Sequence, residues 1–529
     1  MNATSSENSR VAKAFGVVGS ATLLSRILGF VRDAVIAWLL GAGLNADAFF
    51  VAFRIPNLLR RLFAEGSLSI AFIPVFTGYL TAQGKDEAFS LARSALRMLC
   101  LLLVIAAVAG VLLSPMIIRL MAPGFIISPA KFSLAVLLTR VMFPYIIFIC
   151  LAALCMGVLN ALGHFAAPAL APVLLNLTMI GSMFFISPHI REPAVGLAFG
   201  VLIGGLLQLS LQLPYLTRNG FLFWQKARLY HPGLKRIGQL MGPAVFGAAV
   251  YQINILIGTL LASLLPEGSV SYLYYADRVV QFPLGVFAIA TATAVLPSLS
   301  RQAAEKNFAA LSDTFSYAMR FVFFITAPAM VGLMVLRAPI VTLLFQRGAF
   351  DLQAARMTAS ALFFYGLGLW AFSAVRIVVA TFYALQDTRT PVKMAFVSVC
   401  VNILLSIILM KPLAHGGLAL ATSLASMVNL CLLVWALTRK IDTMEYKGMI
   451  ESACKTLLCS AIMGLGVWAV AGATLPAPSG AVSGLLPGLG ASILAGLVLY
   501  GAASFWLKSR ELHTLLSLFK RGGRLKNPD

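Results

Sequence analysis

The sequence predicts an all-α protein that crosses a membrane many times. Hydrophobic residues make up 60% of the 529 positions, and the mean hydropathy is +0.92. Charged residues make up only 11%, well below the roughly 25% typical of soluble domains. Apolar runs of about 20 residues, the length that spans a bilayer as a helix, recur from one end of the chain to the other. No polar segment is long enough to form a separate soluble domain.

Run lengths and helix breakers predict about 14 transmembrane helices. The expected spans are 12–40, 46–82, 88–121, 131–161, 166–187, 194–217, 237–265, 270–301, 312–345, 353–385, 392–411, 416–438, 448–473 and 484–508. Arg26 and Arg32 interrupt the first of them, so no cleaved signal peptide is expected. The seven cysteines lie in or beside apolar runs without a C-x-x-C pair, which indicates packing roles.

The net charge of +22 would suggest a nucleic-acid partner in a soluble protein, but here the basic residues lie mostly in short loops between apolar runs. An even number of helices puts both termini on one side of the membrane. Loops on that side are the more basic ones, and cytoplasmic loops are enriched in Lys and Arg. We therefore expect both termini in the cytoplasm and no nucleic-acid partner.

An internal repeat organises the first 440 residues. A-F-R-I-P-N at 52–57 recurs as A-D-R-V-V-Q at 276–281, and further matches follow in order at a nearly constant offset of about 220 residues. Parallel repeats in transporters are related by an axis along the membrane normal. We expect two six-helix lobes related by such a pseudo-two-fold axis. The expected domains are an N-terminal lobe at 1–235, a C-terminal lobe at 236–440, and two extra helices with a basic cytoplasmic tail at 441–529.

The stretch from Ser25 to Pro74 is apolar yet holds eight charged side chains. They are Arg26, Arg32, Asp33, Asp47, Arg54, Arg60, Arg61 and Glu65. A charge at membrane depth costs about 2.5–3.5 kcal/mol on insertion scales, so such residues pair, face a water-filled cavity or bind a ligand. Five arginines against three carboxylates leave positive charge in excess, which favours a cavity that holds an anion. The alternative is that some arginines extend to the membrane surface.

Local pairing is the other alternative at several of these positions. Arg32 has Asp33 beside it. Glu65 follows Arg61 by four residues, a spacing that favours an ion pair on a helix. Asp47 lies at an expected helix start, where a carboxylate interacts well with the helix dipole.

Asp277 and Arg278 are adjacent, oppositely charged residues in the early helices of the second half. Because Arg278 matches Arg54 in the repeat, a central position is expected for it. The alternative is a neutral internal pair. Local sequence does not decide between the two.

The sequence contains no constellation typical of an enzyme. It has no H-E-x-x-H, G-x-S-x-G or P-loop motif and no clustered acidic pair. Only five histidines and 18 acidic residues occur, so a metal-dependent transferase would be short of ligands. No metal site, catalytic residue or cofactor is expected.

Several of these stretches resemble the MurJ (MviN-type) lipid II flippase family. They are S-R-I-L-G-F-V-R-D-A from 25, G-A-G-L-N-A-D-A-F-F-V-A-F-R-I-P-N-L-L-R-R-L-F-A-E-G-S-L-S-I-A-F-I-P from 41, M-A-P-G-F from 121, Y-Y-A-D-R from 274 and Q-D-T-R-T-P from 386. The resemblance implies the multidrug/oligosaccharidyl-lipid/polysaccharide exporter fold. It also implies a transporter in the cytoplasmic (inner) membrane that flips the undecaprenyl-pyrophosphate-linked peptidoglycan precursor, lipid II, to the outer leaflet by alternating access.

The resemblance also assigns residue roles. It implies that arginines in the cavity bind the pyrophosphate and that two acidic positions are functionally important. The arginines are Arg26, Arg32, Arg60 and Arg278; the acidic residues are Asp47 and Glu65, with Asp277 as a further candidate. The last two helices are implied to shape a groove for the polyprenyl tail.

One departure from the family concerns ion coupling. The same resemblance implies that some relatives bind sodium through carboxylates in the second lobe. The corresponding region here offers Asn254, Asn402 and Ser406 but no carboxylate. We therefore expect the membrane potential, more than a sodium gradient, to bias the transport cycle.

The expected partners are lipid II, membrane lipids and other cell-wall synthesis or division proteins. Two other functions remain open from the sequence. One is export of another lipid-linked oligosaccharide. The other is a membrane enzyme acting on polyprenyl-phosphate sugars, which also needs arginines near a phosphate.

Overall fold

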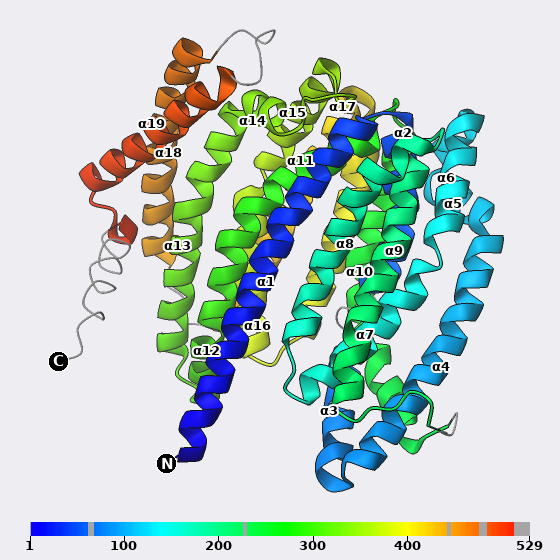
Figure 1. Cartoon of the computed structure of the whole chain (residues 1–529). Helices are drawn as coiled ribbons and strands as arrows, with labels where there is room; N and C mark the ends of the chain where they lie inside the picture. The colour runs from blue at the N-terminus through cyan, green and yellow to red at the C-terminus, as the bar shows by residue number, and fades with distance from the viewer. Residues whose placement is uncertain (1, 62–67, 226–229, 442–445, 476–483, 513–529) are drawn as a thin grey trace. The chain divides into compact units, whose positions relative to one another are not determined.

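The computed structural model describes residues 2–61, 68–225, 230–441, 446–475 and 484–512. Within these ranges the chain is helical and contains no strand (Figure 1). The predicted all-α class is therefore confirmed. The chain divides into two compact units, residues 1–271 with 347–350, and residues 272–346 with 351–529. The lobe boundaries expected from the repeat, at 235/236 and 440/441, stay a prediction.

The first unit contains the helices up to α10 and the first turn of α11. They are α1 (Asn2–Leu40), α2 (Leu44–Leu59), α3 (Leu68–Ala82), α4 (Lys85–Leu112), α5 (Ser114–Met121), η2 (Pro123–Ile127), α6 (Pro129–Met142), α7 (Tyr145–Ala161), α8 (Ala166–Phe185), η3 (Ser187–His189), α9 (Pro193–Arg218) and α10 (Pro232–Ser263). Prolines begin α6, α9 and α10, where a missing backbone N–H costs nothing. In packing, α8 contacts α1 and α9, while α2 contacts α6.

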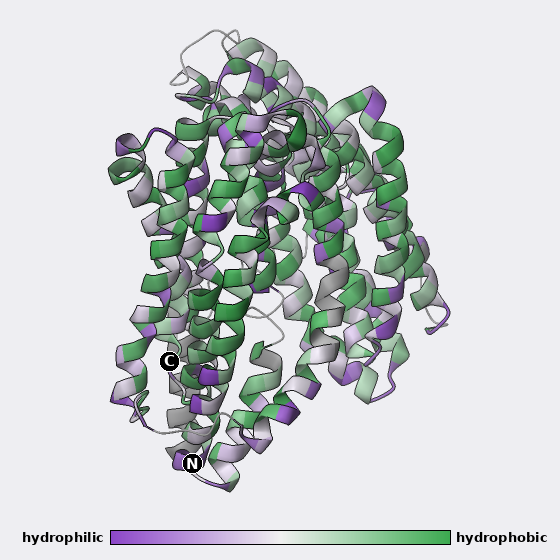
Figure 2. Cartoon of the chain, turned by 90° about the vertical axis from the view of Figure 1, so that its right-hand side faces the viewer, coloured by the Kyte–Doolittle hydropathy of each residue, from purple (hydrophilic) through white to green (hydrophobic). Residues whose placement is uncertain are grey.

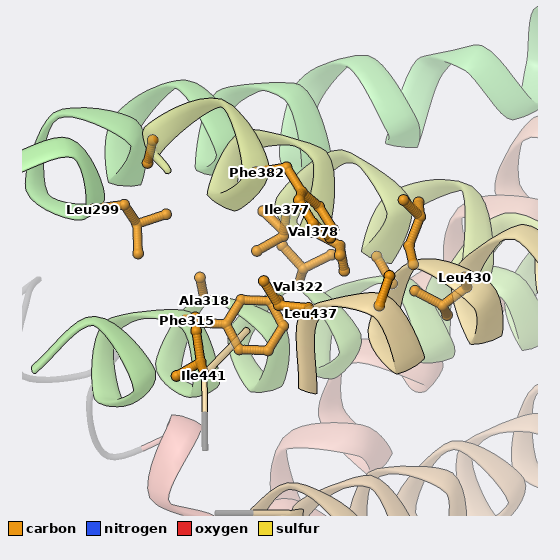
Figure 3. Close-up of a cluster of buried hydrophobic side chains, with 14 of the residues drawn as sticks. Leu299, Phe315, Ala318, Val322, Ile377, Val378, Phe382, Leu430, Leu437 and Ile441 are labelled. Atoms are coloured by element: carbon orange, nitrogen blue, oxygen red, sulfur yellow. The ribbon is translucent and has the colours of Figure 1, made fainter. Parts of the chain in front are cut away.

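The second unit contains the remaining helices. They are α11 (Ser269–Pro283), η4 (Leu284–Ala288), α12 (Ile289–Ala304), α13 (Phe308–Val335), α14 (Arg337–Phe345), α15 (Leu352–Gly366), α16 (Leu369–Ala384), α17 (Arg389–Thr438), α18 (Tyr446–Thr474) and α19 (Leu485–Trp506). Leu299, Phe315, Ile377 and Leu437 belong to a buried apolar cluster that joins α12, α13, α16 and α17 (Figure 3). Since lipid is as apolar as leucine, such close packing rather than hydrophobic transfer holds membrane helices together.

Hydrophobic residues predominate along most of the helices, as expected for helices that contact lipid (Figure 2). Within the described residues, nine helical segments are long and apolar enough to cross a membrane, or ten if the bent pair α15–α16 forms one span. The protein is therefore a multi-pass membrane protein. Each expected span falls on one or more of the described helices: 270–301 falls on α11, η4 and α12, and both 392–411 and 416–438 fall on α17. The count of 14 crossings stays a prediction.

The long helix α17 consists of two antiparallel halves. Ala414 adopts φ 47° and ψ −130°, which breaks the helix just after Pro412. The Asp387 carboxylate, before the first half, accepts hydrogen bonds from the backbone N–H groups of Arg389 and Thr390 and pairs with Lys440, after the second half. The expected spans 392–411 and 416–438 thus run in opposite directions, side by side.

Asp387 also belongs to the Q-D-T-R-T-P stretch. Although burial opposes it, hydrogen bonds from Lys440 and Thr390 hold the pKa of the Asp387 carboxyl well below its usual range. Its folded pKa is thus depressed, so its contribution to stability is present at neutral pH and is lost only as the pH falls below the ordinary range of an aspartate.

The loop after α14 docks on the end of α1. Ala349 donates its backbone N–H to the carbonyl of Trp38 at 2.9 Å. Gly348 has φ +57°, and a Cβ there would lie 2.4 Å from that carbonyl oxygen. Only glycine fits both the backbone conformation and the close approach.

We predict opposite stability effects for two alanine-to-glycine changes in α17. Ala414→Gly should raise stability by about 1 kcal/mol, because glycine adopts φ 47° and ψ −130° without strain. Ala421→Gly, at a buried helical position, should lower stability by about 1 kcal/mol. Thermal unfolding of the purified protein in detergent checks both; equal destabilisation by the two changes would contradict a strained break at Ala414.

Candidate functional site

Arg32 lies in a polar contact between α1 and α8. Its Nε and Nη2 donate to Asp33 Oδ1 at 3.0 and 2.7 Å, and its Nη1 donates to Asn176 Oδ1 at 3.0 Å. The amide of Asn176 in turn donates to the carbonyl of Ser25 at 3.0 Å. The Arg32 side chain is 12% exposed and that of Asp33 is 4% exposed. A charge-assisted network of this kind fixes the direction of the guanidinium within the first unit.

The other two predicted site arginines of the first unit have different surroundings. Arg26 lies six residues before Arg32 on α1 and is exposed. Arg60 follows the end of α2 and is half-buried; its Nε and Nη2 donate to Asn57 Oδ1 at 3.1 and 2.8 Å. Asn57 comes directly after Pro56, the proline inside α2. These two hydrogen bonds thus go to one local acceptor.

Arg278 lies on α11 in the second unit, with its guanidinium over the ring of Tyr274. The centroid lies 4.7 Å from Cζ, and Nη2 donates to the Tyr274 hydroxyl at 2.8 Å. Nη1 donates to Gln281 Oε1 at 3.4 Å, and the Gln281 amide donates to Asp277 Oδ2. Stacking on an aromatic face and a flanking amide orient the planar fork of the guanidinium.

Asp47 contacts two other helical segments of the first unit through its carboxylate. The carboxylate is buried, and Oδ2 accepts from Lys131 Nζ at 2.6 Å and from the backbone N–H of Gly268 at 2.8 Å. Oδ1 accepts from the backbone N–H and the hydroxyl of Ser271 at 2.9 and 2.6 Å. The Lys131 ammonium also lies 4.5 Å from the centre of the Phe125 ring. Asp47 therefore joins α2, α6 and the first turn of α11.

This arrangement differs from the interaction that sequence suggested for Asp47. The residue does lie in the first turn of α2, where it favours the dipole of its own helix. Its hydrogen bonds, however, go to the N-terminus of α11, a different helix. Glu267 adds a second link, because its Oε1 accepts from the backbone N–H of Leu44 at 2.8 Å.

The predicted residues therefore fall into separate groups. Arg26, Arg32, Arg60 and Asp47 belong to the first unit, while Asp277 and Arg278 belong to the second. Convergence of the arginines on one ligand stays a prediction. Glu65 lies outside the described residues.

Sequence reasoning missed two residues that hold these charges in place. Lys131 begins the expected helix 131–161, and its side chain is buried in the structure. Asn176 is a lone amide in an apolar run, which is itself a signal, because a polar side chain at membrane depth needs a partner.

No group of three or more His, Cys, Asp or Glu side chains that could hold a metal occurs in the part of the chain that the structure describes. Asn254, Asn402 and Ser406 stand in the region where some relatives are implied to bind sodium. Ser406 Oγ lies 3.5 Å from Asn402 Oδ1, and both side chains are buried. Asn254 is half-buried on α10. Each of these side chains offers a neutral oxygen.

Comparison with known proteins gives consistent matches. Residues 36–482 match the family described as lipid II flippase MurJ. A probable lipid II flippase MurJ from Vibrio cholerae is 42% identical over 446 residues, which cover 82% of this chain and 85% of that protein. A probable lipid II flippase MurJ from Rhizobium meliloti is 37% identical over 521 residues and covers 97% of both chains.

Solved structures agree in fold. A lipid II flippase MurJ in an inward closed conformation superposes with a TM-score of 0.78 and 28% identity, covering 93% of this chain and 98% of that one. An inward-facing multidrug resistance MATE family transporter of the MOP superfamily superposes with a TM-score of 0.67 at 18% identity, covering 80% and 97%, which shows the shared fold. The chain therefore belongs to the lipid II flippase MurJ family, whose members are transporters rather than enzymes.

Proposed function

We propose that this protein moves lipid II from the inner to the outer leaflet of the cytoplasmic membrane. The observation that carries the proposal is the match of residues 36–482 to the lipid II flippase MurJ family. The charged residues of the described helices suit transport better than chemistry, because arginines with amide and aromatic partners bind anions without forming covalent bonds.

We further propose that Arg32, Arg60 and Arg278 together hold the pyrophosphate, with Arg26 adding to the positive field. These arginines lie on three helices, and a diphosphate offers oxygens on several sides. Arg binds such oxygens in bidentate fashion, so each guanidinium group would hold oxygens on a different side of the anion. A substrate that binds one conformational state more tightly shifts the population toward that state, as alternating access requires.

The exposed apolar surfaces of α18 and α19 suit the polyprenyl tail. Leu465 and Trp468 on α18 are each 70% exposed, and Leu497 and Val498 on α19 are similarly open. A long isoprenoid chain is favoured on such a surface because it replaces lipid contacts without loss. Membrane lipids occupy the same faces in the absence of substrate.

Asp47 supports closure of one end of the protein in this proposal. Its carboxylate holds the start of α11 against α2 and α6 through four hydrogen bonds. We expect this end to face away from the cytoplasm, because both termini are expected inside and α1 ends just before Asp47. For that end to open, the four hydrogen bonds of Asp47 must break and be replaced by hydrogen bonds to water.

We predict that Ala at Arg32, Arg60 or Arg278 abolishes complementation of a strain depleted of its lipid II flippase. Each loses a charge and a planar fork that the pyrophosphate needs, whereas Lys retains the charge and should keep partial function at one or more positions. Arg356→Ala, an exposed arginine on α15, is the matched control and should complement fully. Full complementation by all three Ala variants at wild-type protein levels would make these arginines structural.

We predict strong energetic coupling between Asp47 and Lys131. Removing either partner leaves the other charge buried and unpaired, which costs about 3–5 kcal/mol. The double variant Asp47→Asn with Lys131→Gln should lose clearly less stability than the sum of the single changes. Thermal unfolding of the four proteins measures the coupling.

The exposed pair Glu451–Lys455, at 2.8 Å on α18, serves as the control for this cycle and should show little coupling. Additive losses at Asp47 and Lys131 would show that the two charges do not stabilise each other.

We predict that both termini are cytoplasmic. Loop charge asymmetry favours that orientation, and an even number of crossings keeps the two ends together. Fusions of a reporter that is active only in the cytoplasm should give signal at either end. An intact but inactive C-terminal fusion would refute the even count.

A further inference from the structure

A second basic site lies in the first unit, apart from the four arginines of the proposed substrate site. A cavity of about 260 Å³ lies between α4, α7, α9 and the segment that follows α9. Its lining residues are Arg93, Leu96, Arg97, Cys100, Leu151, Cys155, Leu209, Leu213 and Phe223. Two arginines of α4 thus line the cavity, and the remaining lining residues are Leu, Cys and Phe.

Arg93 has a buried guanidinium donor that the described residues do not satisfy. The residue is 9% exposed, and its Nε is buried without a hydrogen-bond partner among the described residues. Arg97 lies one helical turn further on, and like charges at that spacing repel each other. Asp86 and Glu87 lie in the first turn of α4, about two turns before Arg93, and Glu87 pairs with His231 at 3.0 Å. The pair is therefore poised for an anion.

The walls of the cavity are held in place by independent contacts. Arg97 Nη2 donates to the carbonyl of Gln225 at 2.7 Å, which fixes the segment after α9 against α4. Phe221 packs edge-on against Phe89 of α4 and against Phe223, with ring centroids 5.2 and 4.9 Å apart. The cavity is thus a built feature of the unit and not a loose surface gap.

The surroundings indicate which anion fits. Beyond Cys100, α4 presents the exposed apolar side chains Leu101, Ile105, Val108 and Leu112, which lie along one side of the helix. A ligand with a negative head and long apolar chains satisfies both the arginines and this face. The cavity is slightly smaller than the 300–1,000 Å³ typical of sites that enclose whole ligands, which suits a headgroup with its chains outside.

We propose that Arg93 and Arg97 bind the phosphate of an anionic phospholipid, whose acyl chains lie along the exposed apolar face of α4. Basic pockets between transmembrane helices on the cytoplasmic side are known to take such headgroups. The lipid bridges α4, α7 and α9 to residues 219–225, which follow α9. It therefore stabilises this part of the first unit, and it does so independently of lipid II transport.

The test measures binding of dioleoyl phosphatidylglycerol to the full-length protein in detergent by native mass spectrometry. Arg93→Gln should weaken binding about tenfold, which corresponds to loss of a charge-assisted hydrogen bond. Arg218→Gln is the matched control, since this exposed arginine at the end of α9 does not line the cavity, and it should bind like the wild type. Thermal unfolding confirms that each variant is folded.

Two further measurements distinguish binding of an anionic lipid from binding of a neutral lipid or of free phosphate. Dioleoyl phosphatidylcholine should bind at least tenfold more weakly than phosphatidylglycerol, and inorganic phosphate should not displace the lipid. If Arg93→Gln does not fold, Leu209→Phe, which fills the cavity without changing charge, should reduce phosphatidylglycerol binding instead. Wild-type phosphatidylglycerol affinity in folded Arg93→Gln, or in Leu209→Phe where Arg93→Gln does not fold, would overturn the proposal. So would equal binding of phosphatidylcholine, or displacement of the lipid by inorganic phosphate.

Discussion

The need to satisfy every charge held within apolar helices is the constraint on which the rest of this structure depends. Asp47 shows it most directly: one buried carboxylate collects an ammonium, two backbone N–H groups and a hydroxyl. Three helices are thereby held to a single point. Arg32 follows the same rule with Asp33 and Asn176. Because an unpaired charge in such surroundings costs several kcal/mol, these contacts select one packing of the helices over its alternatives.

Sequence sufficed for the fold class because hydropathy is a local property. A run of about 20 apolar residues needs a helix to satisfy its backbone in lipid, whatever its neighbours are. The same logic located the charged stretch from Ser25 to Pro74. It also separated the two halves of α17, since Pro412 and the glycines after it mark a break that the structure places at Ala414. The total number of crossings and the relation between the lobes depend on more than local pattern and stay predictions.

The partners of the charged residues could not be predicted, because they depend on which helices become neighbours. Lys131 lies 84 residues from Asp47, and Asn176 lies 144 residues from Arg32. Spacing rules on one helix reach only three or four residues. The local pair between Arg32 and Asp33 was within their reach, and the structure contains it. Arg93 could not be singled out from sequence either. It stands out because its buried Nε has no hydrogen-bond partner among the described residues, and no sequence pattern predicts that.

The account as a whole attributes transport to anion binding without covalent chemistry. Its most direct test is the translocation of labelled lipid II by the purified protein in sealed vesicles, with an impermeant reagent outside to detect the lipid that has crossed. The account predicts that the detected fraction rises with time, that the lipid recovered is chemically unchanged, and that Arg278→Ala vesicles lag far behind. A rate equal to that of protein-free vesicles, or recovery of a covalently altered lipid, would contradict it.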